Sequence, residues 1–133
     1  MSKLIQMKSD SGENLFPITA VESGSNSNGK YVKYSDGTMI EWDERYYDNI
    51  AFSNDYGGRG ILYLASKTIT FPVAFVGDSP TCVCGSFLWG TGASWGLCRS
   101  TSLASALLYG FDLFPRASGT DTLISWIAIG RWK

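Results

Sequence analysis

The sequence contains no histidine, and this absence restricts the chemistry that the protein could perform. Histidine is the usual general base at neutral pH, it activates serine and cysteine nucleophiles, and it completes most zinc sites. An enzyme built on this chain would therefore have to use carboxylates, lysine or tyrosine.

Cysteine is scarce as well, and the three cysteines cannot all pair within one chain. Cys82 and Cys84 are two residues apart on an expected strand, so their side chains point to one face, while Cys98 lies farther along. We expect reduced thiols that act as small core residues, with no metal or other cofactor. A disulfide between Cys98 and one of the other two, or a metal site, is the alternative interpretation.

Charge is low: charged residues make up 17% of the 133 residues, and the net charge is −1. Lysine and arginine are scattered, without the basic patch of a protein that binds nucleic acid or a membrane surface. No apolar stretch approaches the ~20 residues that span a bilayer. Polar residues interrupt the apolar ones near the N-terminus, so we expect no signal peptide and synthesis in a cytoplasm.

The sequence does contain short alternating runs separated by glycine-rich turns, which predict an all-β fold. Asp36-Gly37, between the runs 30–34 and 38–42, is typical of a tight hairpin turn. Residues 43–60 are expected to contain a long loop, and residues 103–109 could form a short helix, although we favour a strand. Further strands are expected over residues 61–65, 67–71, 81–89, 97–100, 104–114 and 122–132, a spacing typical of an antiparallel β-sandwich or a barrel.

The N-terminal residues predict a separate arm. Residues 3–8 and 15–18 are extended runs on either side of a polar turn, which indicates a short β-hairpin. Residues 23–29, SGSNSNG, have the composition of a flexible polar linker. We therefore divide the chain into an arm with its linker, residues 1–28, and a β-sandwich head, residues 29–133.

Two glycine-rich loops carry the candidate ligand-binding residues. A tryptophan in such a loop either packs down onto the protein or offers a stacking surface to a ligand. Aromatic rings stack on the apolar faces of sugars, and neighbouring charges bind the hydroxyls, so the loops predict a sugar site. Packing or a solvated loop is the competing interpretation, and we expect Trp42, Trp126 and Trp132 to pack in the core or between subunits. The candidates are Trp95, Trp89, Arg99, Asp55, Tyr56 and Arg59.

Carboxylates gather at Glu41, Asp43, Glu44 and Asp48. Glu41 and Asp43 would share a strand face, where they could form the acid and base of a glycosidase. Asp43, Asp48 and Asp55 could bind Ca²⁺, although their spacing is not that of an EF-hand. A solvated strand end is the simpler interpretation, and we expect no catalytic residue.

Three segments of the chain carry a resemblance to a known family. The most specific is the C-terminal SWIAIGRWK, residues 125–133. The others are TITFPVAF, residues 68–75, followed by PTCV at residues 80–83, and the hairpin GKYVKYSDGTMIEW, residues 29–42. Together they resemble the final strand, the central strand pattern and the opening hairpin of bacteriophage tail-fibre C-terminal heads, a group related to the H-type lectins.

The resemblance implies a six-stranded antiparallel β-sandwich that assembles into a homotrimer. The lectin members bind sugars near clefts between subunits and use a histidine beside an aromatic residue, which this chain lacks, so their sugar site is not carried over. A trimer also fits the apolar last strand, which has more apolar surface than a small sandwich can bury alone. The residues concerned are Ile124, Trp126, Ile127, Ile129 and Trp132.

The N-terminal segments KLIQMK, residues 3–8, and NLFPIT, residues 14–19, resemble the openings of compact phage fibre and baseplate proteins. This implies that the arm joins the head to other tail or baseplate proteins. We therefore expect a non-catalytic receptor-binding head in the tail of a virion, assembled in the host cytoplasm, that recognises a bacterial surface saccharide. A structural trimeric cap or baseplate joint without a ligand is the main alternative, and a glycan-degrading enzyme is another.

Overall fold

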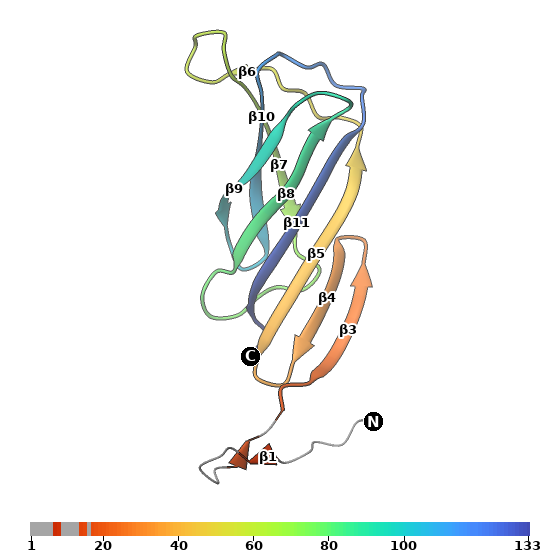
Figure 1. The fold of residues 1–133 in the computed structure, drawn as a ribbon, viewed down its shortest axis with the longest axis vertical. Helices are drawn as coiled ribbons and strands as arrows, with labels where there is room; N and C mark the ends of the chain where they lie inside the picture. Colours follow the sequence, from red (N-terminus) through yellow and green to blue (C-terminus); the bar gives the residue numbers. More distant parts are fainter. Residues whose placement is uncertain (1–6, 9–13, 16) are drawn as a thin grey trace.

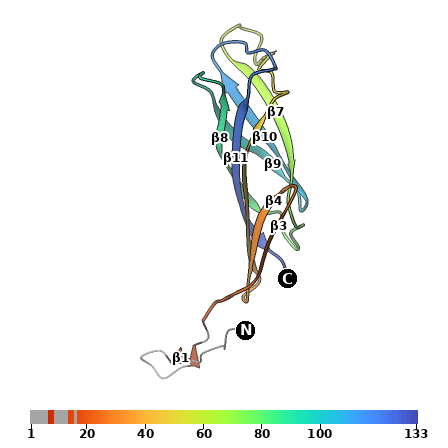
Figure 2. The same cartoon turned by 90° about the vertical axis from the view of Figure 1, so that its right-hand side faces the viewer.

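The computed structural model describes residues 7–8, 14–15 and 17–133, and its regular structure is β-strand throughout. Two antiparallel sheets face each other, as Figures 1 and 2 show from two directions. In spatial order, the five-stranded sheet contains β3 (Ala20–Asn26), β4 (Gly29–Tyr34), β5 (Thr38–Tyr47), β11 (Thr122–Arg131) and β8 (Thr81–Trp89). The four-stranded sheet contains β6 (Asn54–Asp55), β7 (Tyr63–Thr70), β10 (Ser105–Asp112) and β9 (Trp95–Thr101).

The prediction of an antiparallel β-sandwich is confirmed, with corrections to its details. The family resemblance implied six strands, whereas the two sheets have five and four. Strand β5 continues to Tyr47, so the loop predicted over residues 43–60 begins only after it. Residues 105–112 form strand β10 rather than a helix, as we favoured. In the described part of the chain, no helix is long and apolar enough to cross a membrane.

The core lies between the two sheets, where alternation along the strands directs the apolar side chains. Phe87 shows how closely the sheets approach. A Cβ atom at Gly110 would collide with its ring, and one at Gly96 would lie 2.5 Å from its Cβ atom, so both positions require glycine. The other buried core residues are Met39, Ile50, Phe52, Ala65, Ile69, Phe71, Phe75, Ala106, Leu108, Ile124, Trp126 and Ala128.

The hairpin predicted at Asp36-Gly37 forms between β4 and β5. Gly37 has a φ of +96°, in the region that favours glycine, and the Asp36 carboxylate accepts a hydrogen bond from the Thr38 N–H at 2.9 Å. The two strands pair only between the Lys33–Met39 and Lys30–Trp42 positions. The second half of β5 therefore has no partner on this side, and one flank of the sandwich stays open there.

Residues 23–29 do not form a flexible linker, and this prediction is wrong. Strand β3 pairs with β4 from Ala20 opposite Tyr34 to Asn26 opposite Gly29. The Asn26 side chain also donates a hydrogen bond to the Pro72 carbonyl at 2.8 Å, which ties the hairpin to the rest of the sandwich. An exposed edge strand favours small and polar residues, so its composition resembles that of a linker.

The predicted N-terminal hairpin is present where the structure describes it. Strand β1 (Met7–Lys8) pairs with β2 (Asn14–Leu15) in antiparallel register, and Figure 1 shows both at one end of the molecule. The rest of this hairpin lies outside the described residues. That the head folds without residues 1–28 stays a prediction.

The last strand, β11, has two different faces. Ile124 and Trp126 point into the core, where they are 1% and 4% exposed. Ile127 and Ile129 point outward and are 42% and 47% exposed. The prediction that this strand has more apolar surface than the sandwich can bury alone is therefore confirmed by its outward-facing residues.

The three cysteines are unpaired and pack against the core. Burial, with a smaller contribution from Cys98, raises the pKa of Cys82 to about 12 and that of Cys84 to about 11. Thiols of this kind stay protonated and behave as small apolar residues. Within residues 17–133 and the two short strands before them, no three His, Cys, Asp or Glu side chains gather as metal ligands.

Candidate ligand-binding surfaces

Three loops meet at the end of the sandwich opposite the β1–β2 hairpin, and we call this the distal end (Figure 1). They are residues 48–62, 90–94 and 113–121. Backbone hydrogen bonds join them: Phe52 and Arg116 exchange two, and the Gly90 N–H donates to the Asp121 carbonyl at 3.0 Å. The loops therefore form one connected surface on a rigid scaffold, as binding loops commonly do.

Four aromatic residues form a cluster near this end, on the outer face of the four-stranded sheet. Phe111 lies at its centre and is buried. The Trp95 ring stacks on it with centroids 6.0 Å apart, and the Tyr56 and Tyr109 rings meet it edge-on at 5.9 and 6.3 Å. Trp95 and Tyr56 are 45% and 52% exposed. We call Tyr56, Trp95, Tyr109 and Phe111 the distal aromatic cluster.

The structure thus brings together two of the predicted ligand-binding residues, Trp95 and Tyr56, from segments about forty positions apart. Trp95 is not in the loop where we placed it, because it opens strand β9 opposite Phe111. A strand position holds the Trp95 ring more rigidly than a loop would, so its exposed face is fixed in place before any contact is made.

The remaining candidates in these segments have different surroundings. The Asp55 carboxylate accepts hydrogen bonds from the Gly60 N–H at 2.9 and 3.0 Å, so it closes its own loop. Arg59 lies exposed within that loop. Arg99 is the extra residue of a bulge in β9 and is also exposed. The two arginines are accessible to a ligand, whereas the Asp55 carboxylate is already hydrogen-bonded to its own loop.

Trp89 is turned toward the protein. It ends strand β8, and its indole N–H donates to the Ala117 carbonyl at 2.9 Å. The Arg116 guanidinium lies over its ring, 4.6 Å from the centroid, and is itself paired with Asp112 at 3.0 Å. These contacts fix the loop 113–121, and they leave Trp89 less available to a ligand than Trp95.

The two carboxylates considered as a glycosidase pair, Glu41 and Asp43, have different surroundings. Glu41 is fully buried and accepts a hydrogen bond from the Val73 N–H at 2.7 Å. Burial raises its pKa to about 7, although the Val73 hydrogen bond opposes this. Asp43 pairs with Arg45. Glu41 lines neither of the two cavities described next.

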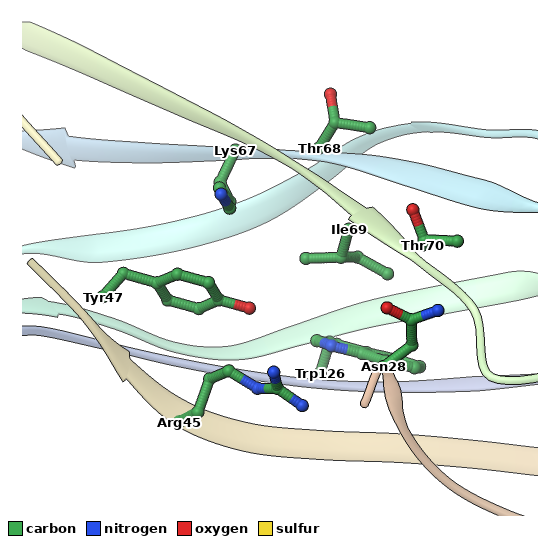
Figure 3. Close-up of a pocket in the computed structure, with 8 residues that line it drawn as sticks. All are labelled: Asn28, Arg45, Tyr47, Lys67, Thr68, Ile69, Thr70 and Trp126. Atoms are coloured by element: carbon green, nitrogen blue, oxygen red, sulfur yellow. The ribbon is translucent and has the colours of Figure 1, made fainter. Parts of the chain in front are cut away.

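A cavity of about 190 Å³ opens on the flank of the sandwich where β5 has no partner, between β5 and β7 (Figure 3). We call it the flank cavity. The lining includes two cations, Arg45 and Lys67, and no carboxylate. The Lys67 ammonium lies 4.8 Å from the centroid of the Tyr47 ring. The lining residues are Asn28, Arg45, Tyr47, Lys67, Thr68, Ile69, Thr70 and Trp126.

The sequence interpretation missed the flank cavity. A signal was present, because Arg45, Tyr47 and Lys67 stand at inward positions of alternating strands, where apolar residues are normal. Which strands would face each other, and that β4 would stop short of this half of β5, follows only from the tertiary arrangement.

A third surface is the outer face of the five-stranded sheet, where apolar side chains line up across β5, β11 and β8. Trp42, Ile127 and Val83 form one cross-strand row, and Tyr46, Leu123 and Leu88 form another. Five of these six side chains are large and at least 38% exposed. A shallow hollow of about 230 Å³ lies beside the first row. We call the two rows with Ile129 the apolar face.

Together these features define a small β-sandwich with aromatic loops at one end and an uncovered apolar face. Solved structures with this fold are pyocin tail fibres, which confirms the predicted resemblance to tail-fibre heads at the level of the fold. No protein-family model and no curated protein matches the sequence.

An N-truncated R1-type pyocin tail fibre aligns with a TM-score of 0.57 and 20% identity, over 86% of this chain and 85% of that one. A longer R1 pyocin fibre fragment of P. aeruginosa gives 0.56 and 21%, over 86% of this chain and 28% of its own. The N-truncated R2-type fibre gives 0.52 and 17%, over 86% and 38%. This chain thus spans well under half of the R2-type and the longer R1 fragments.

Proposed function

We propose that this protein is the receptor-binding head of a phage-type tail fibre, and that it binds a saccharide on a bacterial surface without catalysing a reaction. The observation that carries the proposal is the distal aromatic cluster, where Trp95 and Tyr56 are exposed over a buried Phe111. Exposed aromatic rings on a rigid scaffold suit sugar binding, and Arg59, exposed in the same loop as Tyr56, is available to sugar hydroxyls. The fold shared with pyocin tail fibres supports the same role.

We further propose that the head acts as a homotrimer in which the apolar face is buried between subunits. Exposed contiguous apolar surface of this kind marks interaction sites. The side chains of the two rows are all aliphatic or aromatic, and they lie on strands rather than on loops. No lysine or arginine stands within the rows. Such a surface suits packing between subunits better than selective binding of a ligand.

The position of the β1–β2 hairpin fits a head at the tip of a fibre. The β1–β2 hairpin lies at the end opposite the distal loops (Figure 1), so attachment through residues 1–28 would leave the aromatic cluster directed outward. We propose that this arm connects the head to other tail or baseplate proteins, and that the protein works in the tail of a virion after assembly in a host cytoplasm.

The alternative function is a structural trimeric cap or baseplate joint without a ligand. The two functions are separated by binding of the purified protein to a panel of bacterial lipopolysaccharides and capsular polysaccharides. The receptor-binding function predicts saturable binding to a subset of them, with no release of shortened glycan. Absence of binding across polysaccharides from many hosts, with an intact trimer, would favour the structural alternative.

A further inference from the structure

The geometry points to the flank cavity as a second binding site, one that takes the carboxylate or phosphate of an anionic sugar residue. This rests on the proposed function, since the anionic sugar would be one unit of the bacterial saccharide. The shared chemistry is an oxyanion attached to a sugar ring. The site lies between β5 and β7 (Figure 3), and it shares no lining residue with the distal aromatic cluster.

The cavity carries a positive charge that the protein does not balance. Asp43 is paired with the Arg45 Nε atom, which neutralises one of the two cations. Lys67 is half-buried and forms no ion pair with any described residue. An ammonium group held in such a place favours an anionic partner, because partly excluded water screens its charge less than bulk water does.

Neutral hydrogen-bonding groups face the same space. Figure 3 shows the Tyr47 hydroxyl directed between β7 and β11, with the Arg45 guanidinium below it and the Asn28 side chain at the far side. Burial raises the pKa of Tyr47, with a smaller opposing contribution from Arg45, so its hydroxyl stays protonated and can donate. Hydroxyl and amide groups beside a cation are suited to a sugar ring with a charged substituent.

The Trp126 side chain adds one more hydrogen-bond donor to the cavity. It is 4% exposed, the most buried of the five tryptophans, and it lines the cavity. Its indole N–H has no acceptor among the described residues, and Figure 3 shows the nitrogen on the side toward Arg45 and Tyr47. The indole groups of Trp89 and Trp132 donate to carbonyls at 2.9 and 2.8 Å. An indole N–H that faces the cavity without a protein acceptor is free to donate to a ligand oxygen there.

The size of the cavity limits what it can hold. Its volume of about 190 Å³ equals roughly six water molecules, and it is smaller than the ~300 Å³ at which ordinary ligand pockets begin. One charged substituent with part of its sugar ring fits, and an oligosaccharide does not. The rest of the glycan would lie outside along the open flank of β5.

The test is an NMR titration of the intact protein with glucuronate, glucose 6-phosphate and glucose, following the Trp126 indole N–H signal. We expect at least one of the two anionic sugars to shift this signal saturably, and glucose to leave it unchanged. The anionic sugar that binds identifies carboxylate or phosphate as the recognised group. Equal shifts with glucose, or no saturable shift with either anion up to tens of millimolar, would overturn the proposal.

Substitution of Lys67 provides the second arm. We expect Lys67→Gln to weaken binding of the anionic sugar about tenfold or more, as loss of a charge-assisted hydrogen bond does. Lys30→Gln is the matched control, since Lys30 is an exposed lysine on β4 that is not part of the lining. If Lys67→Gln lowers the melting temperature, Lys67→Met keeps the apolar stem over Tyr47 and isolates the charge. Parent-like affinity in a folded Lys67 variant would contradict the proposal.

Failure here is distinguishable from failure of the proposed function. Suppose that the protein binds a neutral polysaccharide saturably through Trp95 while the Trp126 signal does not respond. The proposed flank site would then be wrong, and the receptor-binding function would stand. If the Trp126 signal responds to an anionic sugar but the protein binds no bacterial polysaccharide, the anion site would stand and the receptor-binding function would be wrong.

Discussion

The two sheets of this sandwich have outer faces of different chemistry. The five-stranded sheet shows cross-strand rows made only of apolar side chains, whereas the four-stranded sheet shows packed aromatic rings next to the glycine-rich loops of the distal end. Both faces expose apolar surface to a similar degree, so exposure alone does not separate them. Their surroundings do: a flat strand face suits a second copy of the chain, and a rimmed aromatic surface suits a ligand.

The largest expected effect comes from placing a charge on the apolar face. Ile127→Glu should convert the proposed trimer to a monomer, because the carboxylate would be buried without a partner at the proposed subunit interface. Leu97→Glu is a matched control, since Leu97 on β9 is also 42% exposed but lies on the other sheet, and it should leave the trimer intact. Light scattering at micromolar concentration measures both. A parent protein that is a stable monomer would refute the interface altogether.

The next effect concerns affinity on the aromatic side. Trp95→Ala removes an exposed stacking face and should cost about 1–3 kcal/mol of binding free energy, or roughly 5- to 150-fold in Kd. The variant should stay folded and trimeric. Trp42→Ala, on the apolar face, should show the reverse pattern, with weaker assembly and parent-like affinity for each site. Calorimetry with a monovalent oligosaccharide is needed, because three heads on one fibre would mask a weakened site through avidity.

The inner faces differ as well, through two buried carboxylates. Asp112 on β10 pairs with Arg116 at 3.0 Å and accepts from the Phe114 N–H at 2.9 Å. Glu41 on β5 has only the Val73 N–H, and its Oε2 atom has no partner among the described residues. The first carboxylate is compensated and the second is not, so neutralising them should have opposite consequences for stability.

Glu41→Gln should therefore stabilise the protein at pH 8 by about 1–3 kcal/mol. The folded-state pKa of about 7 lies above the ordinary value of 4.5, so the folded protein holds this proton more tightly. The stability from protonated Glu41 is complete below about pH 4.5 and is lost as the pH rises through 7. Asp112→Asn should destabilise at both pH values. Denaturant melts at pH 5 and pH 8 test this, and an unchanged Glu41→Gln melt at pH 8 would count against it.

The smallest effect concerns the N-terminal boundary. A protein that begins at Pro17 keeps β3, and it should melt within a few degrees of the full chain. One that begins at Gly29 loses β3 and the Lys33–Glu22 ion pair at 2.6 Å, and it should melt lower by several degrees. Thermal melts of the three proteins decide the boundary. If all three proteins melted at the same temperature, the head would begin at residue 29, as the sequence predicted.

The sequence predicted most of the head because its signals are local. The Asp36-Gly37 turn and the alternating runs on either side of it are read within a dozen residues, and strand β8 was expected over the residues that it occupies. Residues 23–29 were misread since a linker and an exposed edge strand share a small, polar composition, and only the free edge of β4 decides between them.

The site was predicted in part for the same reason. Trp95 and Tyr56 were found as aromatic residues near glycine-rich loops, but the residue that unites them, Phe111, lies in an apolar strand with no local signal. Asp55 and Trp89 were predicted to bind a ligand, but both make contacts within the protein. Asp55 closes its own loop, and the Trp89 ring packs against Arg116. Nothing in a local pattern shows whether a polar group will find its partner within the chain.

The most direct test of the receptor-binding role is an array of bacterial lipopolysaccharides and capsular polysaccharides, probed with the parent protein and with Trp95→Ala side by side. We predict that the parent binds a subset of the glycans saturably and that Trp95→Ala, as a folded trimer, loses most of that signal. Equal binding by the two proteins would move the site away from the distal aromatic cluster. Binding to none of the glycans would contradict a saccharide receptor.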